Sequence, residues 1–221
     1  MNIAIDGPSG AGKSSLAKGL AKYFGMIYVD TGALYRAVGL YAKRKGIPVD
    51  DVTPVEADLD TLRVGLCYKD REQHVLLFDE DVTALIRTPE ISMYASAVSA
   101  RPAVRAFLLE TQRRMAREHS VVMDGRDIGT VILPQAEVKI FLIASDLVRA
   151  KRRKAELESK GICATVEEVL ADMQKRDRND RERETAPAVP AADAILLDNS
   201  DLTEAETIEA AIAVVKEKMK I

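Results

Sequence analysis

The sequence predicts an α/β fold, a parallel sheet of five strands with helices on both faces. First, short and largely apolar runs recur along the chain and are bounded by turn or polar residues, as buried parallel strands are. Second, amphipathic segments of helical length lie between these runs. Third, hydrophobic residues make up 47% and charged residues 30% of the 221 positions, a balance typical of a globular chain with one sizeable core.

Five apolar runs are the expected strands of this sheet. They are NIAID, MIYVD, VVMD, VKIFLIA and AILLDN, at residues 2–6, 26–30, 121–124, 138–144 and 194–199. The helical patterns include residues 13–25, 33–46 and 102–120. Because strand and helix alternate, we expect neighbouring strands to be parallel and joined by crossover helices.

One segment departs from this alternation. LRVGLCYKD and HVLLFDED, around 62–69 and 74–81, predict the strands of a β-hairpin joined by the polar residues REQ. The preceding stretch, GIPVDDVTPVEADLD, contains two prolines and several acids and predicts a loop with a short helix. We therefore expect residues from about 40 to 100 to form an inserted lobe that enlarges a substrate site.

Composition and charge exclude several functional classes. The formal net charge of −3 argues against a general nucleic-acid binder, because the phosphate backbone requires a broadly basic surface. The N-terminus has no basic leader and no apolar run reaches the length of a membrane span, so we expect a cytoplasmic chain without membrane contact. Cys67 and Cys163 have no partner at metal-ligand spacing and are expected to be reduced thiols. No long apolar patch demands a partner, which favours a monomer.

The segment GPSGAGKS matches the phosphate-loop pattern G-x-x-x-x-G-K-[ST] at every fixed position, between an expected strand and an expected helix. Its glycines allow successive backbone N–H groups to point at phosphate oxygens, and the following helix adds its positive end. Lys13 is expected to reach the β- and γ-phosphates, and the Ser14 hydroxyl to ligate Mg²⁺. The pattern predicts a P-loop NTPase type of sheet that binds ATP or GTP through Gly7, Pro8, Ser9, Gly10, Ala11, Gly12, Lys13, Ser14 and Ser15.

Transfer of phosphate to an acceptor is favoured over switching or hydrolysis. The chain contains no N-K-x-D run with which a switch GTPase reads guanine. Asp124 ends the run VVMD and is placed to hold Mg²⁺ through a water molecule. The next residue is Gly125 and not the glutamate with which many ATPases polarise water, so we expect a bound acceptor instead.

Several motifs, in this order and at these distances, resemble the bacterial cytidylate kinase family of nucleoside-monophosphate kinases over essentially the whole chain. They are IDGPSGAGKSS, DTGALYRA, DGRDIGTV, KRDRNDRERE and PAADAILLDNS. The resemblance implies an enzyme of pyrimidine nucleotide metabolism that uses Mg²⁺ and transfers the γ-phosphate of ATP to CMP or dCMP, giving CDP or dCDP and ADP. It also implies a core of residues 1–39, 100–148 and 162–221, a monophosphate-binding lobe of 40–99 with the inserted hairpin, and a small lid of 149–161.

By this resemblance, four residues bind the acceptor's phosphate and base. Thr31 and Arg36 are expected at the CMP phosphate, where the family often has serine at the first position. Arg126 is expected at the same phosphate, and Asp127 at the exocyclic amino group of cytosine. UMP would present a carbonyl oxygen to Asp127, so we expect CMP to be preferred. No residue demands the 2′-hydroxyl, so dCMP is expected to be accepted as well.

Further site residues follow from the same resemblance. Ser96 and Arg105 are expected to complete the base pocket, although without the family both read as ordinary helix residues. In the lid segment SDLVRAKRRKAELESKG (145–161), Arg149 and Arg153 share a helix face, and either can meet the donor phosphates or lie on a solvated face. We assign Arg153 to the donor. The residues expected to act in the transfer itself are Lys13, Arg126 and Arg183.

The run KRDRNDRERE (175–184) contains five positive and four negative side chains and would usually be a solvated helix face. On a helix, Arg176, Asp180 and Arg183 stand at i, i+4 and i+7 and share one stripe. The resemblance places Arg176 and Asp180 at the sugar and Arg183 at the phosphates. The adjoining stripe, expected to be solvated and internally paired, consists of Asp177, Arg181 and Glu184.

Two alternatives to a CMP kinase remain open at this point. The chain could phosphorylate a broader range of pyrimidine or other monophosphates. It could also belong to a different class, a nucleotide-dependent binding or switch protein that transfers no phosphate. Asp127 and Asp180 are both candidates to accept a proton from the attacking phosphate.

Overall fold

The computed structural model describes residues 1–69, 72–159 and 161–220. The chain divides into two compact units: the first comprises residues 1–28 and 120–221, and the second comprises residues 29–119. The lobe expected at 40–99 lies inside the second unit, which is wider at both ends because two long flanking helices belong to it. The assignment of core, lobe and lid by function stays a prediction, and residue 160 of the expected lid lies outside the described residues.

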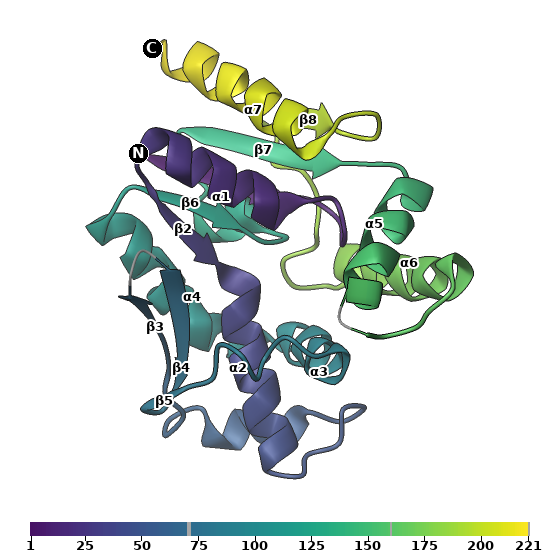
Figure 1. The fold of residues 1–221 in the computed structure, drawn as a ribbon. Coiled ribbons are helices and arrows are strands. Elements are labelled where there is room, and N and C mark those ends of the chain that lie inside the picture. The colour runs from purple at the N-terminus through teal and green to yellow at the C-terminus, as the bar shows by residue number, and fades with distance from the viewer. Residues whose placement is uncertain (70–71, 160, 221) are drawn as a thin grey trace. The chain divides into compact units, whose positions relative to one another are not determined.

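The first unit contains the predicted sheet (Figure 1). Its order is β2-β6-β1-β7-β8, and β1 pairs in parallel with β6 and β7, as β7 does with β8. The predicted five-stranded α/β fold is confirmed, with each strand within two residues of its expected limits. The strands are β1 (Asn2–Asp6), β2 (Ile27–Asp30), β6 (Val121–Asp124), β7 (Val138–Ile143) and β8 (Ile195–Asp198).

Four α-helices and one short π-helical turn complete the first unit. Helix α1 packs beside α7 (Figure 1), and both contribute to a core that includes Leu16, Leu20 and Val215 together with inward side chains of β1 and β7. Capping boxes begin α6 and α7, because a threonine and a glutamate three residues later satisfy the first free N–H groups. The elements are α1 (Lys13–Phe24), η2 (Ile128–Ile132), α5 (Asp146–Ser159), α6 (Val166–Glu182) and α7 (Glu204–Met219).

The second unit has a separate apolar core formed by its helices and a small antiparallel sheet, with Leu34, Val38 and Ile86 fully buried. The predicted hairpin is present, with a third short strand, β5, added to its edge. Of the expected connection REQ, the glutamate and glutamine belong to β4, and residue 71 lies outside the described residues. The elements are α2 (Thr31–Arg44), η1 (Thr53–Asp58), β3 (Val64–Lys69), β4 (Glu72–Leu77), β5 (Glu80–Asp81), α3 (Pro89–Ser99) and α4 (Pro102–Glu118).

The connection between the units falls within β2. The backbone N–H of Ile27 donates to the carbonyl of Ser120 at 3.0 Å, so the segment that leaves the first unit lies beside the segment that returns to it. Cys67 and Cys163, predicted to be reduced thiols, form no disulfide. Within the described ranges, no helix has both the length and the apolar character needed to cross a bilayer.

Candidate active site

The phosphate loop connects β1 to α1, as predicted. Gly7 has φ +146°, and a Cβ there would lie 2.1 Å from the carbonyl oxygen of Leu142 in β7, so only glycine lets the loop leave the sheet at this point. Gly12 precedes α1 and has no side chain to cap the helix. The first N–H groups of α1 are therefore available to an anion placed at the helix N-terminus.

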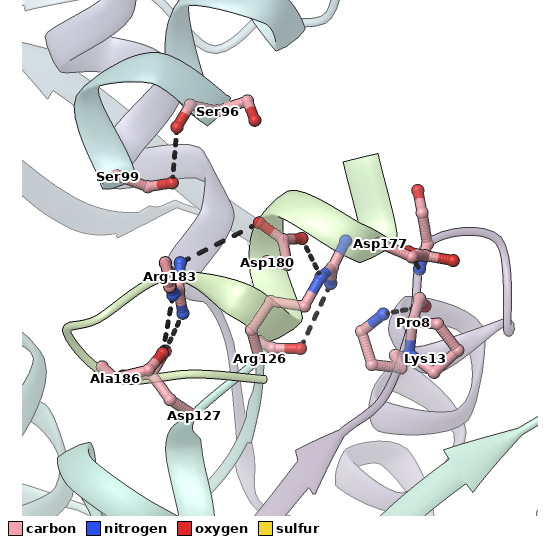
Figure 2. Close-up of polar contacts among 12 residues, drawn as sticks. Pro8, Lys13, Ser96, Ser99, Arg126, Asp127, Asp177, Asp180, Arg183 and Ala186 are labelled. Atoms are coloured by element: carbon pink, nitrogen blue, oxygen red, sulfur yellow. Dashed lines mark hydrogen bonds and ion pairs between the residues drawn. The ribbon is translucent and has the colours of Figure 1, made fainter. Parts of the chain in front are cut away.

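Lys13 is the first residue of α1 and is buried. Its Nζ donates to the carbonyl of Pro8 at 2.7 Å, within the loop itself (Figure 2). Burial, and then the positive charge of Arg126, lower the pKa of Lys13 well below its usual range, while Asp124 and other carboxylates oppose the shift. An anionic phosphate bound beside Nζ would restore the charged form, because opposite charge offsets desolvation.

Ser14 and Asp124 meet at the carboxyl end of β6. The exposed Ser14 hydroxyl donates to Asp124 at 2.9 Å, and the Tyr28 hydroxyl donates to the other carboxylate oxygen at 3.0 Å. In the described part of the chain, no three His, Cys, Asp or Glu side chains are grouped for a metal. One hydroxyl and one carboxylate nevertheless fit Mg²⁺, which usually takes few protein ligands and completes its shell with water and substrate phosphates.

Arginines and carboxylates from the segment after β6 and from the C-terminal end of α6 form a connected cluster (Figure 2). Arg126 donates through Nε to Asp180 at 3.0 Å. Arg183 lies 3.9 Å from Asp180 and 3.4 Å from Asp127, and its Nε donates to the carbonyl of Ala186 at 2.6 Å. Burial disfavours the charge on Arg126, but Asp180 holds the pKa of that guanidinium above its ordinary value. The structure thus brings together four of the predicted site residues, Arg126, Asp127, Asp180 and Arg183.

Asp6, the last residue of β1, supports the loop that carries this cluster. Its carboxylate accepts hydrogen bonds from the backbone N–H groups of Ile128 and Gly129, both at 2.8 Å. Burial raises the pKa of Asp6 to about 6; the two N–H groups lower it, and the charge of Asp127 adds to the rise. Asp6 was not among the predicted site residues, because a single acid at a strand end gives no local signal of what it binds.

The charged run needs two corrections. Asp177, predicted to be solvated, is buried, and it accepts a hydrogen bond from the Ser9 N–H at 2.9 Å. Arg183, predicted on a helical stripe, lies just past the end of α6 with extended backbone, φ −62° and ψ 140°. Arg176 and Asp180 do lie within α6, half-buried and buried, while Arg181 is exposed as expected.

Helix α5 also reaches the phosphate loop, through Arg149, one of the two arginines considered for the donor phosphates, and through Arg152. Arg149 is buried and donates to the carbonyl of Ser9 at 2.8 Å. Arg152 donates to the side chain of Asn199 at 3.1 Å, and Asn199 in turn donates to the carbonyl of Ala11 at 3.0 Å. Asn199 follows β8, and its position after a strand at the ligand-binding edge of the sheet is a signal that could have marked it.

Arg153, assigned to the donor phosphates, is half-buried and pairs with Glu156 at 2.6 Å within α5. This pair is of the i, i+3 kind that stabilises a helix weakly. The assignment of Arg153 to the donor phosphates stays a prediction.

In the second unit, Asp30, Thr31 and Arg36 form a compact group at the start of α2. Asp30 caps the helix by accepting the N–H of Ala33 at 3.0 Å, and Thr31 is its buried first residue. Arg36 lies 3.6 Å from the carboxylate of Asp30, and Arg87 lies 3.3 Å from it. Two arginines therefore converge on one carboxylate at a helix N-terminus, and Arg87 is an addition to the predicted set.

The second unit also holds the two residues predicted for the base pocket. Ser96 is a half-buried residue of α3, and its carbonyl accepts from the Ser99 hydroxyl at 2.9 Å (Figure 2). Arg105 is a buried residue of α4 that donates to the carbonyl of Ser99 at 3.2 Å. Its guanidinium carbon lies 5.5 Å from the ring centre of Tyr35, within cation–π range. An almost fully buried arginine is uncommon on an ordinary helix, which supports a specific role.

Comparison with solved structures shows the fold. An uncharacterised protein from Eubacterium ventriosum superimposes with a TM-score of 0.53 at 15% identity over 98% of both chains. Shikimate kinase from Bacteroides thetaiotaomicron gives 0.50 at 12% identity over 100% of this chain and 99% of that one.

Comparison by sequence is far more specific. The cytidylate kinase of Thermosipho melanesiensis is 47% identical over 219 residues, covering 99% of this chain and 98% of that protein. The cytidylate kinase of Lactiplantibacillus plantarum is 43% identical over 218 residues, covering 99% and 96%. The family model for cytidylate kinase matches residues 3–217. The chain therefore belongs to the cytidylate kinase family.

Proposed function

We propose that this chain transfers the γ-phosphoryl group of ATP to CMP or dCMP, giving CDP or dCDP and ADP. The observation that carries the proposal is the concentration of buried and half-buried cations in the first unit. Lys13 is buried at the phosphate loop, while the half-buried Arg126 and Arg183 form ion pairs with Asp180 and Asp127. Two anionic nucleotides require such compensation, since phosphoryl transfer depends mainly on positioning and charge stabilisation.

For the donor, the proposal uses the phosphate loop and α1. The N–H groups at the start of α1 hold phosphate oxygens, and Lys13 exchanges its bond to the Pro8 carbonyl for one to the β- or γ-phosphate. Bound Mg²⁺ would supply charge neutralisation at the phosphates, with Ser14 as ligand and Asp124 behind it. Arg153 is assigned to the same phosphates.

For the acceptor, the proposal uses the arginines and the base-reading groups. Arg126 and Arg183 fork onto the phosphates being exchanged. Thr31 and Arg36 hold the acceptor phosphate, and the sugar is assigned to Arg176 and Asp180.

Base choice is assigned to Asp127, with Ser96 and Arg105 as further base contacts. Asp127 accepts from the amino group of cytosine, whereas UMP would set a carbonyl oxygen, a second acceptor, against the buried carboxylate. A monomer acting in the cytoplasm, where ATP is supplied, remains part of the proposal.

A coupled assay that detects ADP tests this proposal and its alternatives together. With ATP and Mg²⁺, we expect rapid turnover with CMP and dCMP, slow turnover with UMP, and little ADP without an acceptor. Comparable rates with all monophosphates would favour the broader kinase. ADP formation that ignores the acceptor, or none at all, would overturn the kinase proposal.

The variant Lys13→Met provides the matched test of the donor site. Methionine is unbranched, is only one atom shorter than lysine and carries no charge, so the fold is expected to survive while transfer falls by at least about 100-fold. Thermal unfolding checks the fold. Near-normal turnover in a folded Lys13→Met protein would contradict the donor assignment.

A further inference from the structure

Arg149 is more deeply buried than most arginines and has an unusual number of partners. It belongs to α5, is 4% exposed, and donates to the carbonyls of Ser9 and Ala144 at 2.8 and 3.2 Å. It also forms ion pairs with Asp146 and Asp177. A guanidinium has five N–H donors in a fixed plane, so these four acceptors occupy most of its capacity.

Asp177 completes the arrangement from α6. Its carboxylate pairs with Arg149 through one oxygen and accepts the Ser9 N–H through the other, at 2.9 Å. The N–H and the C=O of Ser9 are therefore both held, one by each member of a buried ion pair. Removing Arg149 would leave the buried Asp177 without this guanidinium, and removing Asp177 would leave the buried Arg149 with only the more exposed Asp146, which is more costly than losing a surface pair.

The next residue of the loop is confined by the same two helices. Gly10 has φ +72°, and a Cβ placed there would lie 2.7 Å from Cε of Met173 in α6 and 3.2 Å from the carbonyl oxygen of Arg149. The loop tip at Ser9 and Gly10 thus packs directly against α5 and α6. Its conformation is set by these helices as well as by its own glycines.

We propose that Arg149 and Asp177 are a positioning pair for the donor nucleotide. They hold Ser9, and through it the phosphate loop, in the conformation that receives a nucleoside triphosphate, and they do not bind the phosphates themselves. Arg149 acts on the loop backbone because its donors are committed to the Ser9 carbonyl and its other partners. The inference rests on the proposed function only for the identity of the donor.

The direction in which Asp177→Asn changes the affinity for ATP distinguishes positioning of the loop from a purely electrostatic effect. If the pair acted only through its field, Asp177→Asn would remove a negative charge near the phosphates and tighten ATP binding. If the pair positions the loop, the same change weakens binding, because the amide no longer holds both Arg149 and the Ser9 N–H. A lysine at 149 keeps the charge but cannot make the planar set of contacts.

Equilibrium titration of Mg·ATP into the full chain, without an acceptor, is the test. We expect Asp177→Asn and Arg149→Lys each to raise the Kd for Mg·ATP by about tenfold or more, since small displacements of a binding loop are costly. The KM for CMP should change much less. The matched control is Asp172→Asn, the same charge change at an exposed position of the same helix, and its Kd should equal that of the parent.

Unchanged or tighter Mg·ATP binding in Asp177→Asn, or parental binding in Arg149→Lys, would overturn the inference. If Asp177→Asn does not unfold cooperatively, Arg149→Lys decides alone, because it retains the buried charge pair. The titration is independent of phosphoryl transfer. A parent chain that binds Mg·ATP but fails to phosphorylate CMP would refute the proposed function and leave the positioning pair testable.

Discussion

The variant Asp6→Asn measures how much free energy of unfolding is lost when the buried Asp6 carboxyl group ionises. Asp6 is 4% exposed, and burial raises its pKa from an ordinary 3.8 to about 6 despite the hydrogen bonds from Ile128 and Gly129. A raised carboxyl pKa means that the folded state binds more protons than the unfolded state between pH 4 and 6. The free energy of unfolding therefore falls as pH rises through this window, and the loss is complete above it.

The size of this effect follows from the shift. A difference of about 2 units corresponds to roughly 3 kcal/mol at full ionisation, most of it between pH 4 and pH 7. Asparagine cannot ionise, so its variant lacks this slope. We expect the free energy of unfolding of Asp6→Asn, relative to the parent, to increase by about 2 kcal/mol from pH 4 to pH 7. Any constant difference in packing between carboxylate and amide cancels from this comparison.

Urea unfolding at several pH values measures this quantity directly. The control is Asp172→Asn, because that exposed acid in α6 should give a curve parallel to the parent. Parallel curves for the parent and Asp6→Asn between pH 4 and pH 7 would show that Asp6 is not held with a raised pKa, and would refute the reasoning.

Three further substitutions test separate parts of the site. Arg183→Ala should reduce turnover by about 100-fold, because Arg183 contacts the carboxylates of Asp127 and Asp180. Arg181→Ala, at an exposed position, should reduce it by less than about twofold, and equal losses in the coupled assay would contradict the assignment of Arg183 to the site. Gly10→Ala should lower the free energy of unfolding by about 1–3 kcal/mol, because Gly10 has a positive φ and an added Cβ would crowd Met173. An unchanged urea midpoint would count against this close packing of the loop on α6. Asp127→Asn should reduce the preference for CMP over UMP by about tenfold or more, and a constant ratio of the two rates would exclude Asp127 as the base reader.

Local patterns were sufficient for the sheet and the phosphate loop. Each strand lies within two residues of its apolar run, because burial of a parallel strand on both faces requires continuous apolar sequence. The loop from Gly7 to Ser14 was predictable because its backbone conformation depends on residues adjacent in sequence. The hairpin followed from its alternation, but β5 is too short to have a pattern of its own.

The supporting charges were not predictable in the same way. Asp177 has the sequence environment of a solvated helix residue, and its burial is decided by Arg149, 28 positions earlier in the chain. Asp6 likewise binds backbone groups more than 120 positions away. Helical spacing therefore identifies which residues share a face, but the partner that packs on that face is set by tertiary contacts. The prediction that Arg183 shares a helical stripe was wrong because the helix ends one residue before it.

The hydrogen bond between Ile27 and Ser120 bears on how the segment between them can be accommodated as an insertion. Because these two backbones are neighbours within the first unit, the chain leaves that unit and returns to it at adjacent positions. Proteins commonly tolerate the insertion of a domain whose two ends lie close together, as the ends of this segment do.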